Sequence, residues 1–343
     1  MGPGRPDLAR RVEARLLQGM DAAGVALRPG RRGAAEPSLP PPPPGRPLLV
    51  ACSGGPDSLV LLHLLRFGCR GLPPLRVAHL DHGMRRGSAA DARWLAGVCA
   101  SWELPLHTAE LSPPPTSEGE ARTRRHAWLE ALRQEVGASR VLLAHHADDQ
   151  VETVLFRAVR GTGVQGLRGM DAVRLPALLR PLLAEPAVEL RAWARRHHLR
   201  GRIDPTNLDP AASRNRLRHR VLPELEATHP GARAALARLG RRARAHAAAL
   251  DALLETPLET VVERATDQEV VVAREAFLAY AFSVRTELLH RLAGRLGIRL
   301  AESGTLDAVE FIATGRPGGR LPLPGGGALL LAACHFVIEG SRR

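Results

Sequence analysis

The stretch ACSGGPDSLVLLHLL, Ala51 to Leu65, decides the fold, because it joins a short apolar run to a helix-like apolar pattern through a turn of small and polar residues. Gly54 and Gly55 lack the Cβ atoms that block close backbone approach, so consecutive N–H groups can surround an anion. A helix expected to begin near Asp57 adds the positive end of its dipole to that turn. The stretch therefore predicts a phosphate-binding loop between a strand and a helix.

This loop differs from the Walker type of phosphate loop. The GxxxxGK[ST] spacing is absent, and all 48 basic residues of the Lys and Arg class are arginine. Ser53 and Ser58 can donate hydroxyl hydrogen bonds to a phosphate instead. The alternative is an ordinary strand–turn–helix in which the glycines serve geometry alone. The complete SGGPDS hexapeptide after an apolar run favours anion binding.

Apolar runs and helix-like stretches alternate through this part of the chain. The runs begin near residues 47, 75, 104 and 140, and the helical stretches cover about 57–66, 88–101, 118–135 and 148–159. Strand–helix repeats of about 30 residues predict crossover units and an α/β fold with a doubly wound parallel sheet. In such a sheet the ligand binds at the carboxyl ends of the strands, where the phosphate loop is expected.

Composition divides the chain into three expected parts. Residues 1–45 combine an amphipathic helix pattern with the proline-rich segment Pro37 to Pro47, which cannot form a helix. Residues 46–225 carry the strand–helix repeats and form the predicted catalytic domain. Residues 226–343 contain long helical patterns, a β-like VVVA segment and a C-terminal hairpin pattern with a Gly-rich turn. We expect the last part to be a smaller, mainly helical domain.

The chain carries a formal net charge of +13, which predicts an acidic partner. Nucleic acid is the first candidate and an anionic membrane surface is the second. No apolar run approaches the roughly 18 residues of a membrane helix, so no membrane-spanning helix is expected, and nucleic acid is predicted as the partner with no membrane partner. The four cysteines form no CxxC pair and no zinc spacing, so reduced thiols in the cytoplasm are expected.

Polar residues follow the second expected strand and lie along a later helix. The segment HLDHGMR, His79 to Arg85, would project beside the phosphate loop. Nucleotide contacts are favoured there over a zinc site, because further ligand spacing is absent. The helix starting near residue 118 places Arg122 and Arg125 three positions apart on one face. That face is either a cationic wall over the site or a solvated charged surface.

The fourth expected strand leads into the segment HHADDQVET. Asp149 and Glu152 share one face of a helix that begins near Asp148. Two carboxylates at this place could bind an amine or magnesium, or they could cap the helix. Capping explains Asp148 but does not explain Glu152. His145 and His146 are either core histidines or members of the site.

The motifs together resemble those of a known family. SGGPDS is similar to the pyrophosphate-binding loop of the ATP pyrophosphatases, which split ATP between its α and β phosphates. The segments that resemble the tRNA-isoleucine lysidine synthetases are SGGPDS, HLDHGMR, the E-x-x-A-R-x-x-R helix, HHADDQVET with RGTGVQGLRGM, RPLL and DPTNLDPAASRNRLRHRVLP. The resemblance covers about residues 46–225. His126 stands where the family usually has tyrosine.

This resemblance implies a PP-loop enzyme that converts the wobble cytidine of a minor isoleucine tRNA, with anticodon CAU, to lysidine. ATP would adenylate the oxygen on carbon 2 of the base, and the amine of L-lysine would then displace AMP. Mg²⁺ would bind through ATP, with no dedicated metal site. A homodimer is possible, and the C-terminal domain is expected to contact tRNA or a second copy.

The resemblance also implies residue roles. Binding of ATP falls to Ser53, Gly54, Gly55, Pro56, Asp57, Ser58, His79 and Arg85. The catalytic set is Asp57, Arg122, Asp149 and Glu152, of which Asp149 and Glu152 would hold the amine of lysine with Arg122 nearby. Contact with tRNA falls to Arg125, Arg214, Asn215, Arg216 and Arg218.

Two other functions fit parts of the pattern. A tRNA cytidine thiolase would use the same ATP chemistry, but it would need a paired, exposed cysteine motif, which the sequence lacks. A basic RNA-binding protein could keep a nucleotide as a structural ligand only. The complete loop and the pair of acidic residues favour the enzyme.

Overall fold

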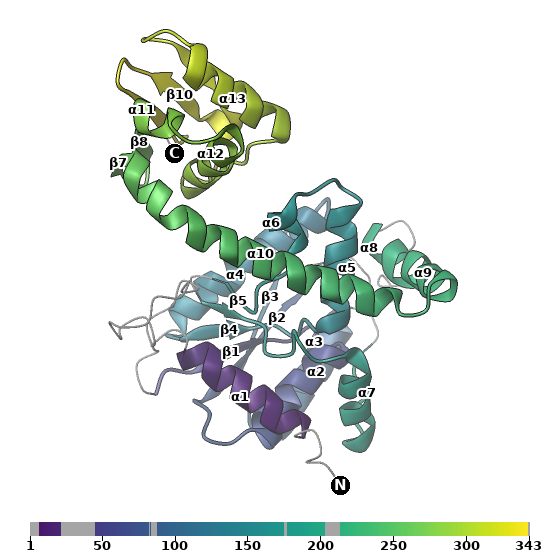
Figure 1. The fold of residues 1–343 in the computed structure, drawn as a ribbon. Coiled ribbons are helices and arrows are strands. Elements are labelled where there is room, and N and C mark those ends of the chain that lie inside the picture. The colour runs from purple at the N-terminus through teal and green to yellow at the C-terminus, as the bar shows by residue number, and fades with distance from the viewer. Residues whose placement is uncertain are drawn as a thin grey trace. The chain divides into compact units, whose positions relative to one another are not determined.

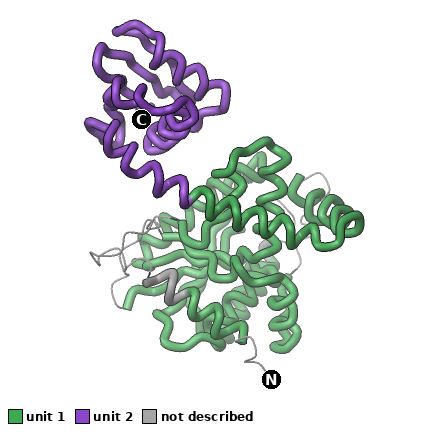
Figure 2. The backbone as a smooth tube through the Cα atoms, viewed as in Figure 1, with its two compact units in different colours: residues 1–247 green, residues 248–343 purple. Residues whose placement is uncertain are grey.

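The computed structural model describes residues 7–21, 45–81, 83, 88–174, 177–202 and 213–341. Contacts divide the chain into two compact units, Met1–Ala247 and Ala248–Arg343 (Figure 2). None of the helices in the described ranges is long and apolar enough to cross a membrane.

The first unit is built on a six-stranded sheet. Its strands are β1 (Leu48–Ala51), β2 (Leu75–Asp81), β3 (Leu106–Glu110), β4 (Arg140–Leu142), β5 (Val173–Arg174) and β6 (Leu178–Leu179). Their order is β3-β2-β1-β4-β6-β5, and every pair is parallel except β5 with β6. Val50 of β1 aligns with Val77 of β2 and with Leu142 of β4. The predicted doubly wound parallel sheet is confirmed, and its four predicted strands form one edge and the centre.

Helices follow the strands as the periodicity predicts. The predicted helices are α2 (Pro56–His63) with its π-helical continuation η2 (Leu64–Gly68), α3 (Ser88–Ser101), α4 (Glu118–Glu135) and α5 (Ala147–Ala158). Ser117 caps α4, because its hydroxyl accepts the N–H of Glu120. Pro56 occupies the first turn of α2, where its missing N–H would have had no helical partner.

Alternate residues of β1 enter cores on opposite faces of the sheet. Leu48 and Val50 pack in the same cluster as the buried residues of α2, whereas Leu49 packs with Leu129 of α4. Each fully buried leucine contributes about 1.5–3 kcal/mol. Helices therefore cover both faces, as the ribbon in Figure 1 shows.

The N-terminal helix pattern is confirmed as α1 (Leu8–Asp21). Leu8, Ala9 and Val12 are buried in the same core as α2 and as α7 (Ala187–Arg196). The proline-rich segment lies outside the described residues except for its last three positions.

The helix connecting the units is α10 (Ala232–Val261), and the division between them falls within it, not at the expected boundary after residue 225. The reason is that its first half packs on the first unit. A Cβ at Gly240 would lie 2.8 Å from the side chain of Val154, and Arg244 donates to Asp171 at 2.8 Å. Before it come α6 (Val164–Leu167), α8 (Ser213–Arg216), η4 (Leu217–Val221) and α9 (Leu222–Thr228).

The second unit combines helices with a five-stranded antiparallel sheet of order β7-β8-β11-β10-β9. Its elements after α10 are β7 (Val262–Ala265), β8 (Glu269–Ala273), α11 (Arg274–Leu278), α12 (Phe282–Arg295), α13 (Glu302–Thr314), β9 (Arg320–Pro322), β10 (Ala328–Leu331) and β11 (His335–Glu339). The VVVA segment is β8, and the expected hairpin is β9–β10. The helical pattern that follows the VVVA segment forms two helices, α11 and α12. Phe277 and Phe336 pack against each other in the core of the second unit, with ring centroids 5.1 Å apart.

Candidate nucleotide and lysine site

The candidate site lies where the strand order of the first sheet reverses. The chain leaves β1 into α2 and leaves the neighbouring β4 into α5, so both connections open at the same edge of the sheet. A cavity of about 250 Å³ opens there, with Ser53, Asp57, Arg125, His145 and Asp149 in its lining. The segments that the sequence assigned to ATP and to lysine thus share one cavity.

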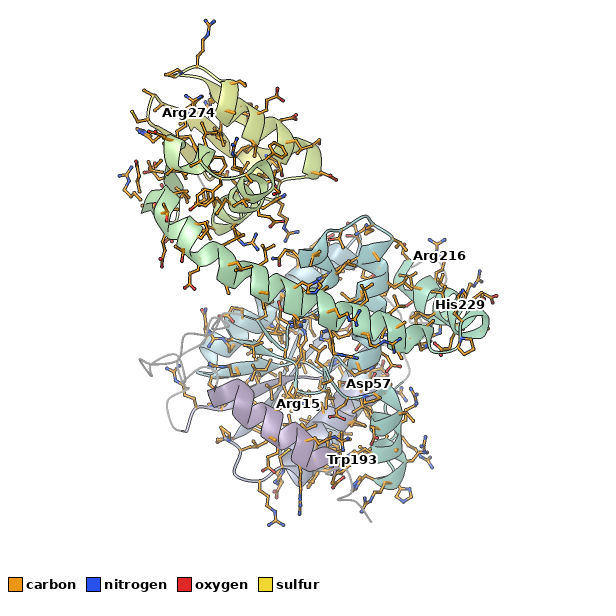
Figure 3. The ribbon with its side chains drawn as sticks, viewed as in Figure 1. Arg15, Asp57, Trp193, Arg216, His229 and Arg274 are labelled. Atoms are coloured by element: carbon orange, nitrogen blue, oxygen red, sulfur yellow. The ribbon has the colours of Figure 1, made fainter. Side chains whose placement is uncertain are left out.

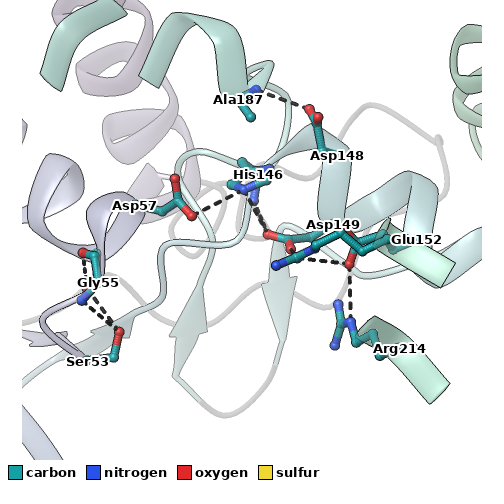
Figure 4. A network of polar contacts seen from close by, with 11 residues as sticks. Ser53, Gly55, Asp57, His146, Asp148, Asp149, Glu152, Ala187 and Arg214 are labelled. Carbon is teal, nitrogen blue, oxygen red and sulfur yellow. Dashed lines mark hydrogen bonds and ion pairs between the residues drawn. The ribbon is translucent and has the colours of Figure 1, made fainter. Parts of the chain in front are cut away.

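The phosphate loop is held open by contacts among its own residues. Gly54 has φ +83°, a conformation that favours glycine. The Ser58 hydroxyl donates to the carbonyl of Gly55 at 3.0 Å and lies 3.2 Å from the Ser53 hydroxyl, and the N–H of Gly55 donates to Ser53 at 3.3 Å (Figure 4). These bonds fix a turn at the N-terminus of α2, where the helix dipole favours an anion.

A segment that the sequence analysis missed supports the same loop. The N–H of Arg202 donates to the carbonyl of Gly54 at 2.8 Å, and its guanidinium donates to Asp91 at 2.7 Å. A Cβ at Gly201 would lie 2.6 Å from the nitrogen of Pro56, so only glycine permits this approach. The signal in the sequence is a single glycine in HHLRGR, which is too weak to be found without the structure.

His79 also supports the loop. Its ring is buried, and Nδ1 lies 2.9 Å from the carbonyl oxygen of Cys52. This contact fits polar support of the loop. No group of three metal-ligating side chains occurs within the described part of the chain. Arg85, predicted to bind ATP, and His82 lie outside the described residues.

His146 connects the loop side of the site to α5. Its Nε2 lies 3.5 Å from Asp57 and 3.6 Å from Asp149 (Figure 4). Burial lowers the pKa of His146, but the hydrogen bond to Asp57 and the charge of Asp149 outweigh it, so the pKa is raised. Asp57 itself keeps 46% of its side chain exposed, so it can contact a bound nucleotide.

At the start of α5 the helix is capped by Asp149, and not by Asp148 as expected. Asp149 accepts the N–H of His146 at 2.9 Å and so caps its own helix. Asp148 instead accepts the N–H of Ala187, the first residue of α7, at 3.1 Å. Oδ2 of Asp149 is therefore structural, and Oδ1 accepts from a cation, the guanidinium of Arg218.

Glu152 is only 2% exposed and is paired with arginines from the segment before α9. Arg218 contacts both oxygens of Glu152, at 2.5 and 2.9 Å, and reaches Asp149 at 2.9 Å. Arg214 lies 3.4 Å from Glu152. A buried carboxylate needs such a cation to offset desolvation. Two of the arginines assigned to tRNA thus lie in the acidic site. Asn215 and the exposed Arg216 lie on α8 between them (Figure 3).

A cluster of arginines faces the other side of the cavity. Arg125 lies in its lining, and its Nε is buried with no hydrogen-bond partner among the described residues. Burial, followed by the charge of a neighbouring arginine, lowers the pKa of Arg122 and of Arg125. Burial and Arg180 lower the pKa of His145 to about 2, so its neutral ring accepts a hydrogen bond from Arg180 at 3.3 Å. Arg125 therefore lies in the wall of the cavity, and the role of this face of α4 as a cationic wall stays a prediction.

The PP-loop domain family matches residues 35–225, which include the phosphate loop, α4, α5 and the Arg218 segment. The chain is therefore a PP-loop protein. Among its relatives, the tRNA(Ile)-lysidine synthase of Gloeobacter violaceus is 40% identical over 228 residues, 64% of this chain and 70% of that protein. The same enzyme of Salinispora arenicola is 38% identical over 83% of this chain and 88% of its own. The chain belongs to the tRNA(Ile)-lysidine synthase family.

Other relatives are longer than this chain. The tRNA(Ile)-lysidine synthase of Thermus thermophilus is 38% identical over 301 residues, and the match covers 84% of this chain but 57% of that protein. The chain spans about half the length of several relatives that it matches, down to 40% for that of Symbiobacterium thermophilum.

Proposed function

We propose that the protein ligates L-lysine to carbon 2 of the wobble cytidine of the minor isoleucine tRNA with anticodon CAU, at the expense of ATP. The products are lysidine, AMP and pyrophosphate, and an adenylated cytidine is the intermediate. The observation that carries the proposal is the shared cavity, which joins an anion-binding loop to a buried pair of carboxylates. Membership of the lysidine synthase family supports it.

The phosphate loop supplies the nucleotide half of the reaction. Backbone N–H groups at the start of α2 and the hydroxyls of Ser53 and Ser58 would stabilise the charge that develops on the pyrophosphate. Mg²⁺, when bound with ATP, neutralises charge on the phosphates. Asp57 fits this role, because it is a half-exposed carboxylate in the first turn of α2, and the described residues offer no three-ligand cluster of their own. His79 orients the loop from beneath.

The carboxylates of α5 would bind the amine of lysine, the second substrate group of the reaction. Asp149 and Glu152 accept hydrogen bonds only when ionised, and they already hold the guanidinium of Arg218. The ammonium of lysine presents the same kind of charged N–H donors, so it can occupy this position when Arg218 moves to another anion. Arg122 lies on α4 one turn before Arg125, which lines the cavity, and its positive charge would favour lysine's carboxylate.

The tRNA would supply such an anion. Arg125, Arg214, Asn215, Arg216 and Arg218 come from the wall of the cavity and from the segment beside it. Arginine pairs well with phosphate, and a net charge of +13 favours RNA binding. The target base must leave the anticodon stack to reach the cavity. We further propose that the enzyme acts in the cytoplasm. The possible homodimer stays a prediction.

The test is mass spectrometry of nucleosides from the minor isoleucine tRNA after incubation with ATP and lysine. Lysidine formation that needs all three substrates supports the proposal. A thiolated cytidine would instead identify the thiolase. That outcome is disfavoured because Cys52, Cys69 and Cys99 are buried, which raises the pKa of each thiol, and the exposed Cys334 is alone. RNA binding without AMP release would identify a non-catalytic binder.

A further inference from the structure

Glu185 is a carboxylate with no exposed surface, and its charge is balanced by the N-terminal helix. Arg11 of α1 donates from Nε at 3.2 Å and from its terminal nitrogen at 2.9 Å to the two oxygens of Glu185. Arg15, one turn later on α1 and labelled in Figure 3, also forms an ion pair with Glu185. These bonds lower the pKa of Glu185 against the opposing effect of burial. A buried carboxylate of this kind depends on its arginines, because losing one reduces the compensation of its charge.

The backbone around Glu185 is bonded to the first turn of α5. The carbonyl of Glu185 accepts the N–H of Ala147 at 2.9 Å, and Asp148 accepts the N–H of Ala187 at 3.1 Å. Segment 185–187 and the start of α5 thus hold each other by reciprocal bonds. The next residues of that turn, His146 and Asp149, belong to the site (Figure 4).

The helix α1 is itself firmly fixed. Leu8, Ala9 and Val12 are buried, and Glu13 accepts the N–H of Arg70 at 2.8 Å. The arginines that hold Glu185 therefore belong to a helix that is packed in the core of the first unit. This element lies outside residues 35–225, the range of the PP-loop match.

We infer that Arg11 and Arg15 are positioning residues for the reaction: through Glu185 they fix the start of α5, and with it His146, Asp149 and Glu152, relative to the phosphate loop. This role rests on the proposed function, because it concerns the alignment of the lysine-binding carboxylates with the nucleotide. Displacements of about 1 Å in such an arrangement can cost on the order of a hundredfold in rate.

The test compares Arg11→Ala with Arg133→Ala. Arg133 is a matched control, since it also forms a two-point ion pair with a glutamate, Glu130 at 2.6 Å, and is similarly shielded, but it has no bond to α5. The first readout is hydrogen exchange of the amides at 146–152 in the substrate-free protein. The second is kcat and KM for lysine in the ligation.

In Arg11→Ala, exchange in the first turn of α5 should rise at least about tenfold and kcat should fall by a similar factor. Arg133→Ala should change neither. Arg11→Lys, which keeps the charge, should recover part of both effects. Faster exchange confined to α1, with α5 and kcat unchanged, would overturn the inference.

The double variant Arg11→Ala with Glu185→Gln separates the effect of Arg11 on the position of α5 from its effect on the stability of the protein. Removing Arg11 together with the charge of Glu185 relieves the poorly compensated buried charge, so thermal stability should return toward that of the wild type. The link to α1 is still missing, so exchange in α5 should remain fast and kcat low. Recovery of kcat together with stability would overturn the inference. If the wild-type protein makes no lysidine, the proposed function fails, whereas the exchange comparison still decides the positioning role.

Discussion

The phosphate loop and the start of α5 are two halves of one site, but different kinds of contact hold them in place. Inside the loop, the bonds of Ser53 and Ser58 join residues within a single turn. At α5, Glu152 depends on Arg218, which is 66 positions away, and Glu185 depends on Arg11, 174 positions away. The turn of the nucleotide half is held mainly by local bonds, with Arg202 and Gly201 supporting it from a distant segment, whereas the carboxylate half depends on tertiary contacts throughout. Substitutions should therefore separate the two halves functionally.

The largest effect is expected from Asp57→Ala in the nucleotide half. We predict loss of ATP-dependent AMP formation with no change in the fold, because Asp57 is half exposed and lies at the first turn of α2, where the phosphates of ATP would bind. The measurement is AMP release with tRNA and lysine, alongside the melting temperature. Glu103→Ala, which changes an exposed carboxylate paired with Arg66, should remain active. A fully active Asp57→Ala enzyme would show that the phosphate loop does not take part in the reaction as proposed.

The next effect is expected from Glu152→Gln in the carboxylate half. The substitution keeps size and removes charge, so the KM for lysine should rise about tenfold to a hundredfold, the range expected for one lost hydrogen bond to a charged group. Adenylated RNA should still form. Single-turnover kinetics with labelled ATP, with and without lysine, separate these steps.

Glu130→Gln is the control for Glu152→Gln, because it changes a carboxylate paired with an arginine away from the cavity. The KM of this control should stay at the wild-type value. If Glu152→Gln blocks adenylation and leaves the KM for lysine unchanged, the carboxylates bind magnesium and the lysine assignment is wrong.

A smaller effect is expected from the arginines before α9. Changing Arg214, Arg216 or Arg218 to Ala should weaken tRNA binding by roughly 1 kcal/mol each, if each makes a charge-assisted phosphate contact. Arg216 is exposed, so its loss should leave the KM for lysine unchanged, whereas loss of Arg218 should alter both values. Titrations at several salt concentrations measure affinity and counterion release. Binding that does not vary with salt would show that the basic surface serves another purpose.

The same contrast explains what the sequence could predict. The helix from residue 88 to 101 and the one from 118 to 135 follow from local periodicity, and the structure has these bounds. The pairing of Arg218 with Glu152, and the approach of Gly201 to Pro56, depend on how distant segments pack. Neither leaves a periodic pattern. Asp148 illustrates the limit, because its capping partner is the start of α7 and not its own helix.

The smallest effect is expected from His126, where the resemblance leads us to expect tyrosine and whose Nε2 is buried with no hydrogen-bond partner in the described ranges. Burial, aided by the charge of Arg122, lowers its pKa from 6.5 to about 4. Between pH 4 and pH 6.5, His126 is therefore protonated in the unfolded chain and mostly neutral in the folded protein. The stability that the neutral ring contributes is present above pH 6.5 and declines as pH falls toward 4.

Tyrosine stays neutral throughout this range, so His126→Tyr should narrow the difference in melting temperature between pH 8 and pH 5. His63 and His145, whose pKa values are also lowered, remain in the variant, so part of the acid sensitivity should persist. The control is His229→Tyr, which changes an exposed side chain at the end of α9 and should leave the difference as it is. Melting curves of the three proteins at both pH values give the result. An equal difference in wild type and His126→Tyr would show that the ring at 126 is protonated in the folded protein as readily as in the unfolded chain.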